Sequence, residues 1–175
     1  MRSKLWFTLA VGLQIAVLLI MIGMKLFTLT YGTKVLLQTL PVDPWDMFRG
    51  DYVTLNYVIT QVDLKKVTAD KKEYKHNERV YVGLKKDGKY WVAKSVSGQP
   101  PDDGSLAIKG KVNYYDEMSK IISINYGIDS YYVPQHEGRK IENARVLADV
   151  EVSVDRWGNS ALSKLFLEGK EVQFQ

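Results

Sequence analysis

The chain of 175 residues contains no cysteine and only two histidines. The absence of cysteine excludes disulfides, thiolate zinc sites, iron–sulfur clusters and a thiol nucleophile. The two histidines, His76 and His136, lie far apart in hydrophilic stretches, so they do not form the closely spaced pair that binds zinc in metalloproteases. The sequence therefore predicts no metal site and no cofactor.

Acidic residues are missing from the N-terminal part of the chain, where none precedes Asp43. Of the 24 lysines and arginines, three (Arg2, Lys4 and Lys25) flank an uncharged run over residues 5–24, and the others nearly balance the 20 acidic residues. Nucleic-acid binding requires a concentrated basic surface that displaces counterions from phosphates. No nucleic-acid partner is expected.

The uncharged run is the one long hydrophobic segment. Residues 5–24 in helical conformation span about 30 Å, the thickness of the hydrocarbon core of a bilayer, so they are expected to contact membrane lipid. A cleaved signal peptide is the competing interpretation, but its apolar region is about 7–15 residues long and is followed by small residues, which residues 24–30 do not provide. We expect an uncleaved anchor, with Gln14 in mid-membrane either tolerated alone or hydrogen-bonded to a partner helix.

The charges that flank the span predict its orientation. Arg2, Lys4 and the N-terminal amine precede it, and Lys25 alone follows closely. This bias favours a single-pass protein of the cell membrane with a cytoplasmic N-terminus and an extracytoplasmic C-terminal domain.

Beyond the span, apolar and polar residues alternate with a period near two, which is typical of strands. The clearest pair covers residues 80–86 and 89–96, joined by Asp87-Gly88, a dipeptide that suits a tight hairpin turn. Residues 28–39 fit either the end of the helix or a first strand, and residues 137–146 fit a short helix. Further strands are predicted over residues 106–114, 120–126, 131–133, 150–154, 161–167 and 172–174.

Many short strands with regular turn signals predict an all-β domain, mainly an antiparallel sandwich or a partly open barrel, behind one N-terminal transmembrane helix. The expected organisation has three parts. Residues 1–27 form the anchor, residues 28–49 a connector and lead-in, and residues 50–175 an extracytoplasmic β-rich domain.

One short box, residues 49–57, reads Arg-Gly-Asp-Tyr-Val-Thr-Leu-Asn-Tyr. It resembles the signature of the GDYXXLXY family of membrane-anchored bacterial proteins of unknown function. The lead-in over residues 41–48, the stretch Tyr131-Tyr-Val-Pro followed by residues 137–142, and the late alternating valines are similar to that family as well. The five matching positions of the box are Gly50, Asp51, Tyr52, Leu55 and Tyr57.

The resemblance extends over nearly the whole chain. It implies a single membrane anchor, a small β-rich domain outside the membrane, and a physical or genetic association with multi-pass membrane proteins. It implies no activity.

The box has a structural and a functional interpretation. In the structural one, Gly50 adopts an unusual backbone conformation, Asp51 fixes a turn, and Tyr52 lies on the strand face opposite Leu55 and Tyr57. In the functional one, polar residues of the box and its lead-in form a recognition surface near the bilayer. These residues are Asp43, Asp46, Arg49, Asp51 and Tyr52.

The expected function is that of a membrane-anchored, non-enzymatic accessory or interaction protein beside a multi-pass membrane partner. The alternative is an extracytoplasmic module that binds a small ligand or the cell wall. Its expected ligand surface consists of Tyr115, Tyr132, His136, Glu137 and Arg139.

A hydrolase with an unrecognised site ranks third. It requires Asp51, His136, Glu137 and Arg139 to converge. A membrane-bound signal peptidase needs a serine soon after the span, whereas no serine occurs between Ser3 and Ser95.

Overall fold

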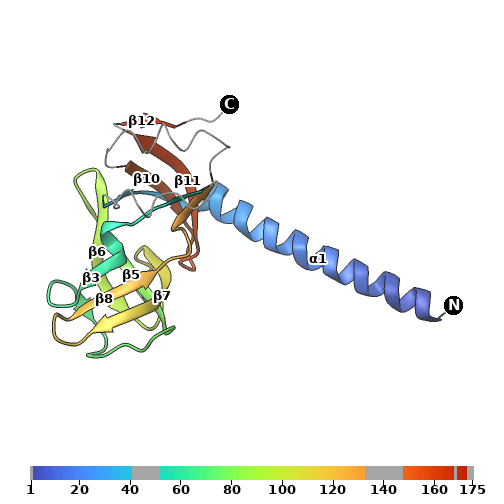
Figure 1. The fold of residues 1–175 in the computed structure, drawn as a ribbon, viewed down its shortest axis with the longest axis horizontal. Helices are drawn as coiled ribbons and strands as arrows, with labels where there is room; N and C mark the ends of the chain where they lie inside the picture. The colour runs from blue at the N-terminus through green and yellow to red at the C-terminus, as the bar shows by residue number, and fades with distance from the viewer. Residues whose placement is uncertain (1, 41–51, 133–147, 168, 173–175) are drawn as a thin grey trace.

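The computed structural model describes residues 2–40, 52–132, 148–167 and 169–172. One long N-terminal helix projects from a body made mostly of strands (Figure 1). The predicted all-β fold behind a single apolar helix is therefore confirmed. In the described part of the chain the strands form separate sheets and do not close into a barrel.

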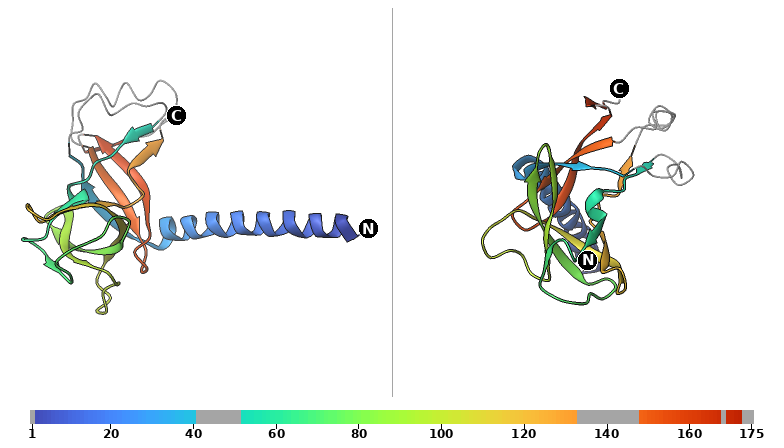
Figure 2. Two further views of the ribbon diagram at one scale, coloured as in Figure 1. Left: turned by 60° about the horizontal axis from the view of Figure 1, so that its bottom comes forward. Right: turned by 90° about the vertical axis from the view of Figure 1, so that its left-hand side faces the viewer.

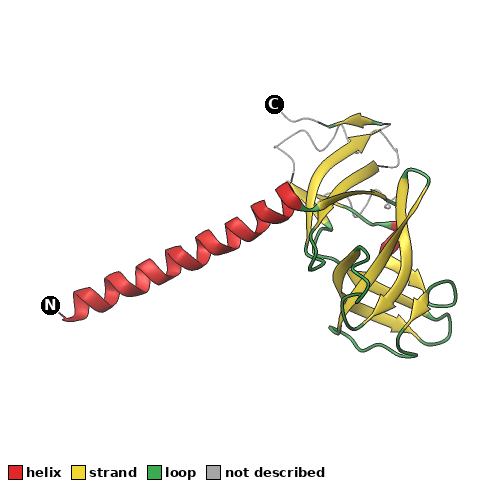
Figure 3. Cartoon of the chain, turned by 180° about the vertical axis from the view of Figure 1, so that it is seen from behind, coloured by secondary structure: helices red, strands yellow, loops and turns green. Residues whose placement is uncertain are grey.

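Helix α1 (Arg2–Tyr31) has 30 residues and is about 45 Å long. It continues past Lys25, because no glycine or proline interrupts residues 25–31 and Gly32 is the first helix-breaking residue after them. Its segment Trp6–Tyr31 is long and apolar enough to cross a membrane. Most large apolar side chains of this segment, from Trp6 to Leu26, are exposed. Figure 3 shows the helix extending away from the strands, which it meets only at its C-terminal end.

The first sheet has the strand order β1-β10-β11-β12, and every pair is antiparallel. Its strand β1 begins one residue after the helix ends. The predicted valine alternation forms β10, in which Val150, Val152 and Val154 are fully buried. The last strand, β12, ends before Val172, where the predicted strand over residues 172–174 begins, and residues 173–174 lie outside the described residues. The strands are β1 (Thr33–Gln38), β10 (Ala148–Val154), β11 (Ser160–Leu167) and β12 (Lys170–Glu171).

The second sheet has six strands in the order β3-β8-β7-β5-β6-β4. The predicted hairpin joins β5 to β6, and Gly88 at its turn has a φ of +60°. Strand β4 pairs with β6 in parallel, whereas the other pairs are antiparallel. The strands are β3 (Gln61–Asp63), β4 (Thr68–Ala69), β5 (Arg79–Asp87), β6 (Tyr90–Ser97), β7 (Ala107–Asp116) and β8 (Ile121–Asn125).

A third, two-stranded ribbon joins β2 (Tyr52–Thr54) to β9 (Ser130–Tyr132). Strand β2 stops at Thr54, so the strand predicted through Tyr57 is shorter than expected, and a 3₁₀ turn over Val58–Thr60 follows. The two- and three-residue elements β3, β4 and this turn were not predicted. The predicted short helix over residues 137–146 lies outside the described residues.

The two large sheets share one hydrophobic core. Strand β1 packs against β6, and side chains of both sheets belong to a single buried cluster. Val35 and Val152 come from the first sheet, and Val82 and Ile122 from the second, and all four have no exposed surface. Figure 2 shows the end of α1 beside β10 and β11, so the first sheet links the core to the helix.

Candidate functional site at the foot of the helix

The helix meets the first sheet without a linker. Gly32 alone separates Tyr31 at the end of α1 from Thr33 at the start of β1, and its amide donates a hydrogen bond of 3.0 Å to the Thr28 carbonyl. A Cβ at Gly32 would lie 2.5 Å from both Ser153 Oγ and Thr28 O. Only glycine allows the last turn of the helix to approach β10 this closely, so the helix and the sheet form a direct junction.

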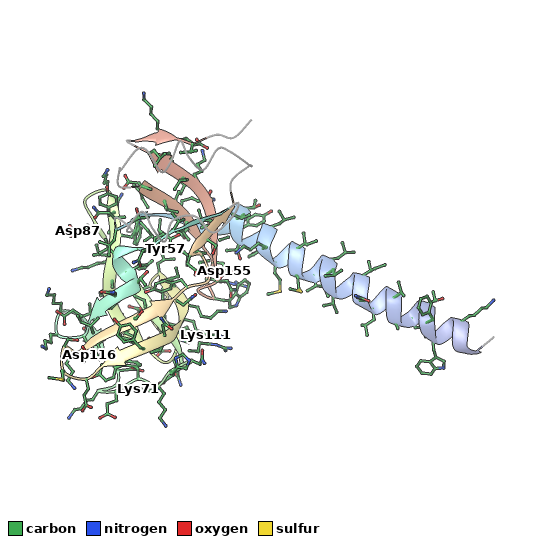
Figure 4. The ribbon with its side chains drawn as sticks, viewed as in Figure 1. Tyr57, Lys71, Asp87, Lys111, Asp116 and Asp155 are labelled. Atoms are coloured by element: carbon green, nitrogen blue, oxygen red, sulfur yellow. The ribbon has the colours of Figure 1, made fainter. Side chains whose placement is uncertain are left out.

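Asp155, at the start of the β10–β11 turn, ties this junction together. Its side chain is 5% exposed. Oδ1 accepts 2.9 Å bonds from the backbone amides of Trp157 and Asn159, and Oδ2 accepts 2.9 Å bonds from Thr28 Oγ1 and Asn159 Nδ2. Thr28 belongs to the helix, so one carboxylate joins the turn to α1 (Figure 4).

A second bond supports the same contact. Ser153 Oγ donates to the Thr28 carbonyl at 2.6 Å, and both residues are buried. Burial by itself raises the pKa of the Asp155 carboxyl, but the hydrogen bonds from Asn159, Thr28 and Trp157 outweigh it and hold the pKa below its usual range. Asp155 is therefore an ionised, fully bonded group at neutral pH.

A groove of about 920 Å³ opens beside this junction, between the helix and the β10–β11 turn. Met21, Met24 and Phe27 of α1 line its apolar side, and Trp157 of the turn lies 5.9 Å from Phe27 between ring centroids. Trp157 is 49% exposed, and the Arg156 guanidinium lies 4.2 Å from its ring centroid. The groove therefore combines long apolar side chains with an aromatic edge.

Two lysines stand at the polar side of the groove. The Lys25 ammonium donates to the Ser160 carbonyl at 3.0 Å, and the Lys109 ammonium donates to Asn159 Oδ1. Both acceptors are uncharged, and neither lysine forms a salt bridge within the part of the chain that the structure describes. The two positive charges are therefore not neutralised there.

The predicted box is only partly described. Residues Asp43, Asp46, Arg49, Gly50 and Asp51 lie outside the described residues. Tyr52 lies in β2 directly opposite Tyr132 of β9, so residues 52–54 of the box lie beside residues 130–132.

The other two box positions are core residues. Leu55 is 5% exposed, and its amide donates to the Asp129 carbonyl at 2.7 Å. Tyr57 is 1% exposed, and its hydroxyl donates to the Ile128 carbonyl at 2.6 Å. Burial raises the pKa of Tyr57, and the negative charge of Asp129 raises it further, so this hydroxyl remains a proton donor.

The described end of the box lies away from the helix. Tyr57 forms a bridge with Thr39, which follows the end of β1, and that strand starts beside α1. Thr39 is six positions after Thr33, which corresponds to about 20 Å along an extended strand. Tyr57 (Figure 4) thus connects the residue after β1 to Ile128, in the segment before β9, from within the core.

Of the predicted ligand surface, the structure describes the side chain of Tyr115 alone. Tyr115 is half-buried against the core, and its hydroxyl donates to the Lys72 carbonyl at 2.9 Å, whereas the neighbouring Tyr114 is 49% exposed. A bulge between Val112 and Tyr114 shifts the register, which reverses the expected faces of the two tyrosines. Tyr132 lies in β9, and His136, Glu137 and Arg139 lie outside the described residues.

No metal-binding group of three or more histidines, aspartates and glutamates occurs in the described ranges. His76 is exposed, and its Nδ1 lies 2.6 Å from the Asn113 carbonyl. The groove at the foot of the helix has apolar side chains and two lysines, so its lining suits a ligand with both an apolar and a charged part.

Sequence reasoning missed the residues that form this junction. Thr28 and Asp155 are 127 positions apart, and nothing in their local patterns predicts the hydrogen bond between them. One local signal was present: Asp155 starts a turn that contains Trp157 and Gly158, an aspartate-led turn with an exposed aromatic.

A comparison with protein-family models matches residues 14–165 to the model described as GDYXXLXY protein. The match includes the box, the second half of α1, the whole second sheet, and the first sheet except the end of β11 and all of β12. No curated protein and no solved structure was found to match the chain.

Proposed function

This chain belongs to the GDYXXLXY family, and on that premise we propose that it is a non-enzymatic accessory protein of the cell membrane. Helix α1 crosses the membrane once, with Arg2 and Lys4 on the cytoplasmic side and the β domain outside. The domain is held in a fixed orientation beside a multi-pass membrane partner.

The direct junction between α1 and the first sheet carries this proposal. A domain that only needs to remain near a membrane requires nothing more than a flexible linker. Here one glycine separates helix from strand, and Thr28 is bonded to both Ser153 and Asp155. A helix end bonded to two positions of the sheet limits the directions in which the domain can face, and such a constraint serves contact with a second protein in the same membrane.

The exposed helix supports the membrane part of the proposal. The large side chains of Leu13 and Leu19 are 69% and 63% exposed, although they are apolar. An apolar surface of this length is stable in lipid and not in water.

The test is to let the β domain rotate freely relative to α1 while α1 remains as the anchor. A flexible glycine–serine linker is inserted between Gly32 and Thr33 of the tagged full-length protein, and the matched control carries the same linker after Gly88, in the exposed β5–β6 turn. Membranes are then solubilised gently and co-purifying proteins are identified. We expect the unaltered protein and the control to retain a multi-pass membrane protein that the junction variant loses. The proposal fails if no membrane protein co-purifies with the unaltered chain, or if the junction variant retains the same partner in equal amount.

A second candidate, the small-ligand or cell-wall module, is favoured by another cavity. This cavity of about 320 Å³ lies between the Pro100–Pro101 loop, Tyr31 and Trp157, and its size suits a small ligand. Thermal unfolding with soluble peptidoglycan fragments tests it. A rise in Tm that Trp157→Ala abolishes supports this candidate, and an unchanged Tm excludes these fragments as the ligand.

A further inference from the structure

The groove at the foot of α1 has two chemically different sides. Its helix side is apolar and includes the flexible side chains of Met21 and Met24. Its other side carries the ammonium groups of Lys25 and Lys109, which are bonded to the consecutive residues Ser160 and Asn159. An apolar side and a cationic side within one groove match a ligand that is itself apolar at one end and anionic at the other.

The charges of the groove are not balanced from within. Among the described residues that line it, Asp155 is the single carboxylate, and all four of its bonds go to Thr28, Trp157 and Asn159. Each lysine ammonium has three N–H donors. The one bond described for each goes to an uncharged oxygen, which leaves donors and positive charge for an anion.

With α1 inserted as proposed, the groove lies at the depth where a phospholipid changes from headgroup to acyl chain. Met21 and Met24 are in the last turns of the apolar helix, whereas Lys109 and Asn159 belong to the β domain. Phe27, Tyr31 and Trp157 lie together between these levels, and aromatic rings favour the membrane interface.

We propose that this groove binds an anionic phospholipid of the membrane that α1 enters. The phosphate lies between the ammonium groups of Lys25 and Lys109, and an acyl chain follows Met21, Met24 and Phe27. This inference rests on the proposed insertion of α1. A partner's transmembrane helix is the less suitable occupant, because it brings apolar surface without an anion and leaves both ammonium groups without a counter-charge.

The test measures lipid binding to the full-length protein. The protein is purified in mild detergent, delipidated, and titrated with phosphatidylglycerol or phosphatidylcholine, and native mass spectrometry counts the bound lipids. The variant K25Q/K109Q removes both cations of the groove. The control K85Q/K86Q removes two exposed lysines of the β5–β6 hairpin and changes the net charge equally. The variant K25R/K109R restores both charges and checks that glutamine acts through charge.

We expect the unaltered protein to retain phosphatidylglycerol in preference to phosphatidylcholine. Each groove lysine replaced by glutamine weakens this binding about fivefold, the factor that one ammonium contributes beside an anionic lipid surface. The control and the arginine variant bind as the unaltered protein does. Equal retention of the two lipids, or equal binding by K25Q/K109Q and K85Q/K86Q, overturns the inference. So does a groove variant that keeps the lipid but loses a co-purifying membrane protein.

Vesicle flotation separates this inference from the insertion on which it rests. The protein is incorporated into vesicles of either lipid and washed with alkaline carbonate. Release from both kinds of vesicle contradicts the insertion of α1, and with it the lipid site. Retention in both, without preference for phosphatidylglycerol in the titration, overturns the lipid site alone.

Discussion

Replacing Asp155 with asparagine removes the charge that joins the β10–β11 turn to the helix. Asparagine accepts hydrogen bonds through one oxygen only. If that oxygen keeps the two backbone amides of Trp157 and Asn159, the new amide nitrogen faces Thr28 Oγ1 and Asn159 Nδ2, both of which donate to Asp155. The Asn159 amide cannot simply turn over, because its oxygen accepts from the Lys109 ammonium. The variant therefore loses two bonds to a charged acceptor at a site that is 5% exposed.

The expected magnitude follows from those two bonds. A hydrogen bond to a charged group contributes about 1.5–3 kcal/mol, and rotation of the Thr28 hydroxyl recovers part of the loss, so Asp155→Asn lowers the free energy of unfolding by about 3 kcal/mol. With an m-value of about 2 kcal/mol/M, the urea midpoint of the β domain falls by about 1.5 M. The measurement is the urea unfolding of the full-length protein in detergent, followed by tryptophan fluorescence.

A second measurement reports the orientation directly. The chain has no cysteine, so spin labels at Leu18→Cys and Lys86→Cys are the only thiol-linked ones. Asp155→Asn should broaden the distance distribution between the helix and the β5–β6 hairpin. The control is Asp116→Asn, because Asp116 accepts comparable bonds from Met118 N and Ser119 Oγ in a turn distant from α1. It should leave the distribution narrow. A urea midpoint unchanged by Asp155→Asn, together with an unchanged distribution, refutes the role given to this carboxylate.

Three further predictions concern pH, the junction glycine and the box. The pKa of Asp155 lies below its usual range in the folded protein, so the stabilisation by its charge is present above the ordinary pKa of 3.8 and is lost as the pH falls through the folded pKa. The difference in urea midpoint between the unaltered protein and Asp155→Asn should therefore shrink below about pH 4. A difference that grows below this pH contradicts the prediction. Gly32→Ala places a methyl group 2.5 Å from backbone and side-chain oxygens and should destabilise the domain by about 3 kcal/mol, whereas Gly23→Ala, with nothing within 4 Å, should be neutral or slightly stabilising in the same urea measurement. Tyr57→Phe leaves the Ile128 carbonyl without its buried donor and should lower the free energy of unfolding by about 1–2 kcal/mol. Its control, Tyr114→Phe, alters a half-exposed ring and should change the free energy of unfolding by less than about 0.5 kcal/mol. Equal effects of the two variants count against a structural role for Tyr57, the last position of the box.

Some strands and turns could be predicted from the sequence and others could not, for physical reasons that differ from one to the next. The β5–β6 hairpin was predictable, because Asp87-Gly88 meets a local requirement for positive φ between two alternating stretches. Strand β4 was not, because two residues carry no period and its parallel pairing with β6 depends on the rest of the sheet. The faces of Tyr114 and Tyr115 were reversed by a bulge, since one extra residue in a strand inverts every later side chain.

The candidate site shows the same division. Lys25 was recognisable in the chain as the cation that closes the apolar run. The residues that meet the helix from the sheet were not, because Ser153, Asp155 and Trp157 reach the helix only when β10 pairs with β1.

Local order along the chain thus determined the apolar helix, most of the strands, the tightest turn and the family of this protein. These properties depend on the period of side chains and on residues a few positions apart. Tertiary structure alone decided that the helix and the sheet meet in a direct, hydrogen-bonded junction, that the groove combines an apolar side with two cations, and that Leu55 and Tyr57 of the box are core residues. Each of these depends on contacts between segments far apart in the chain, and such contacts form only after strand pairing has brought the segments together.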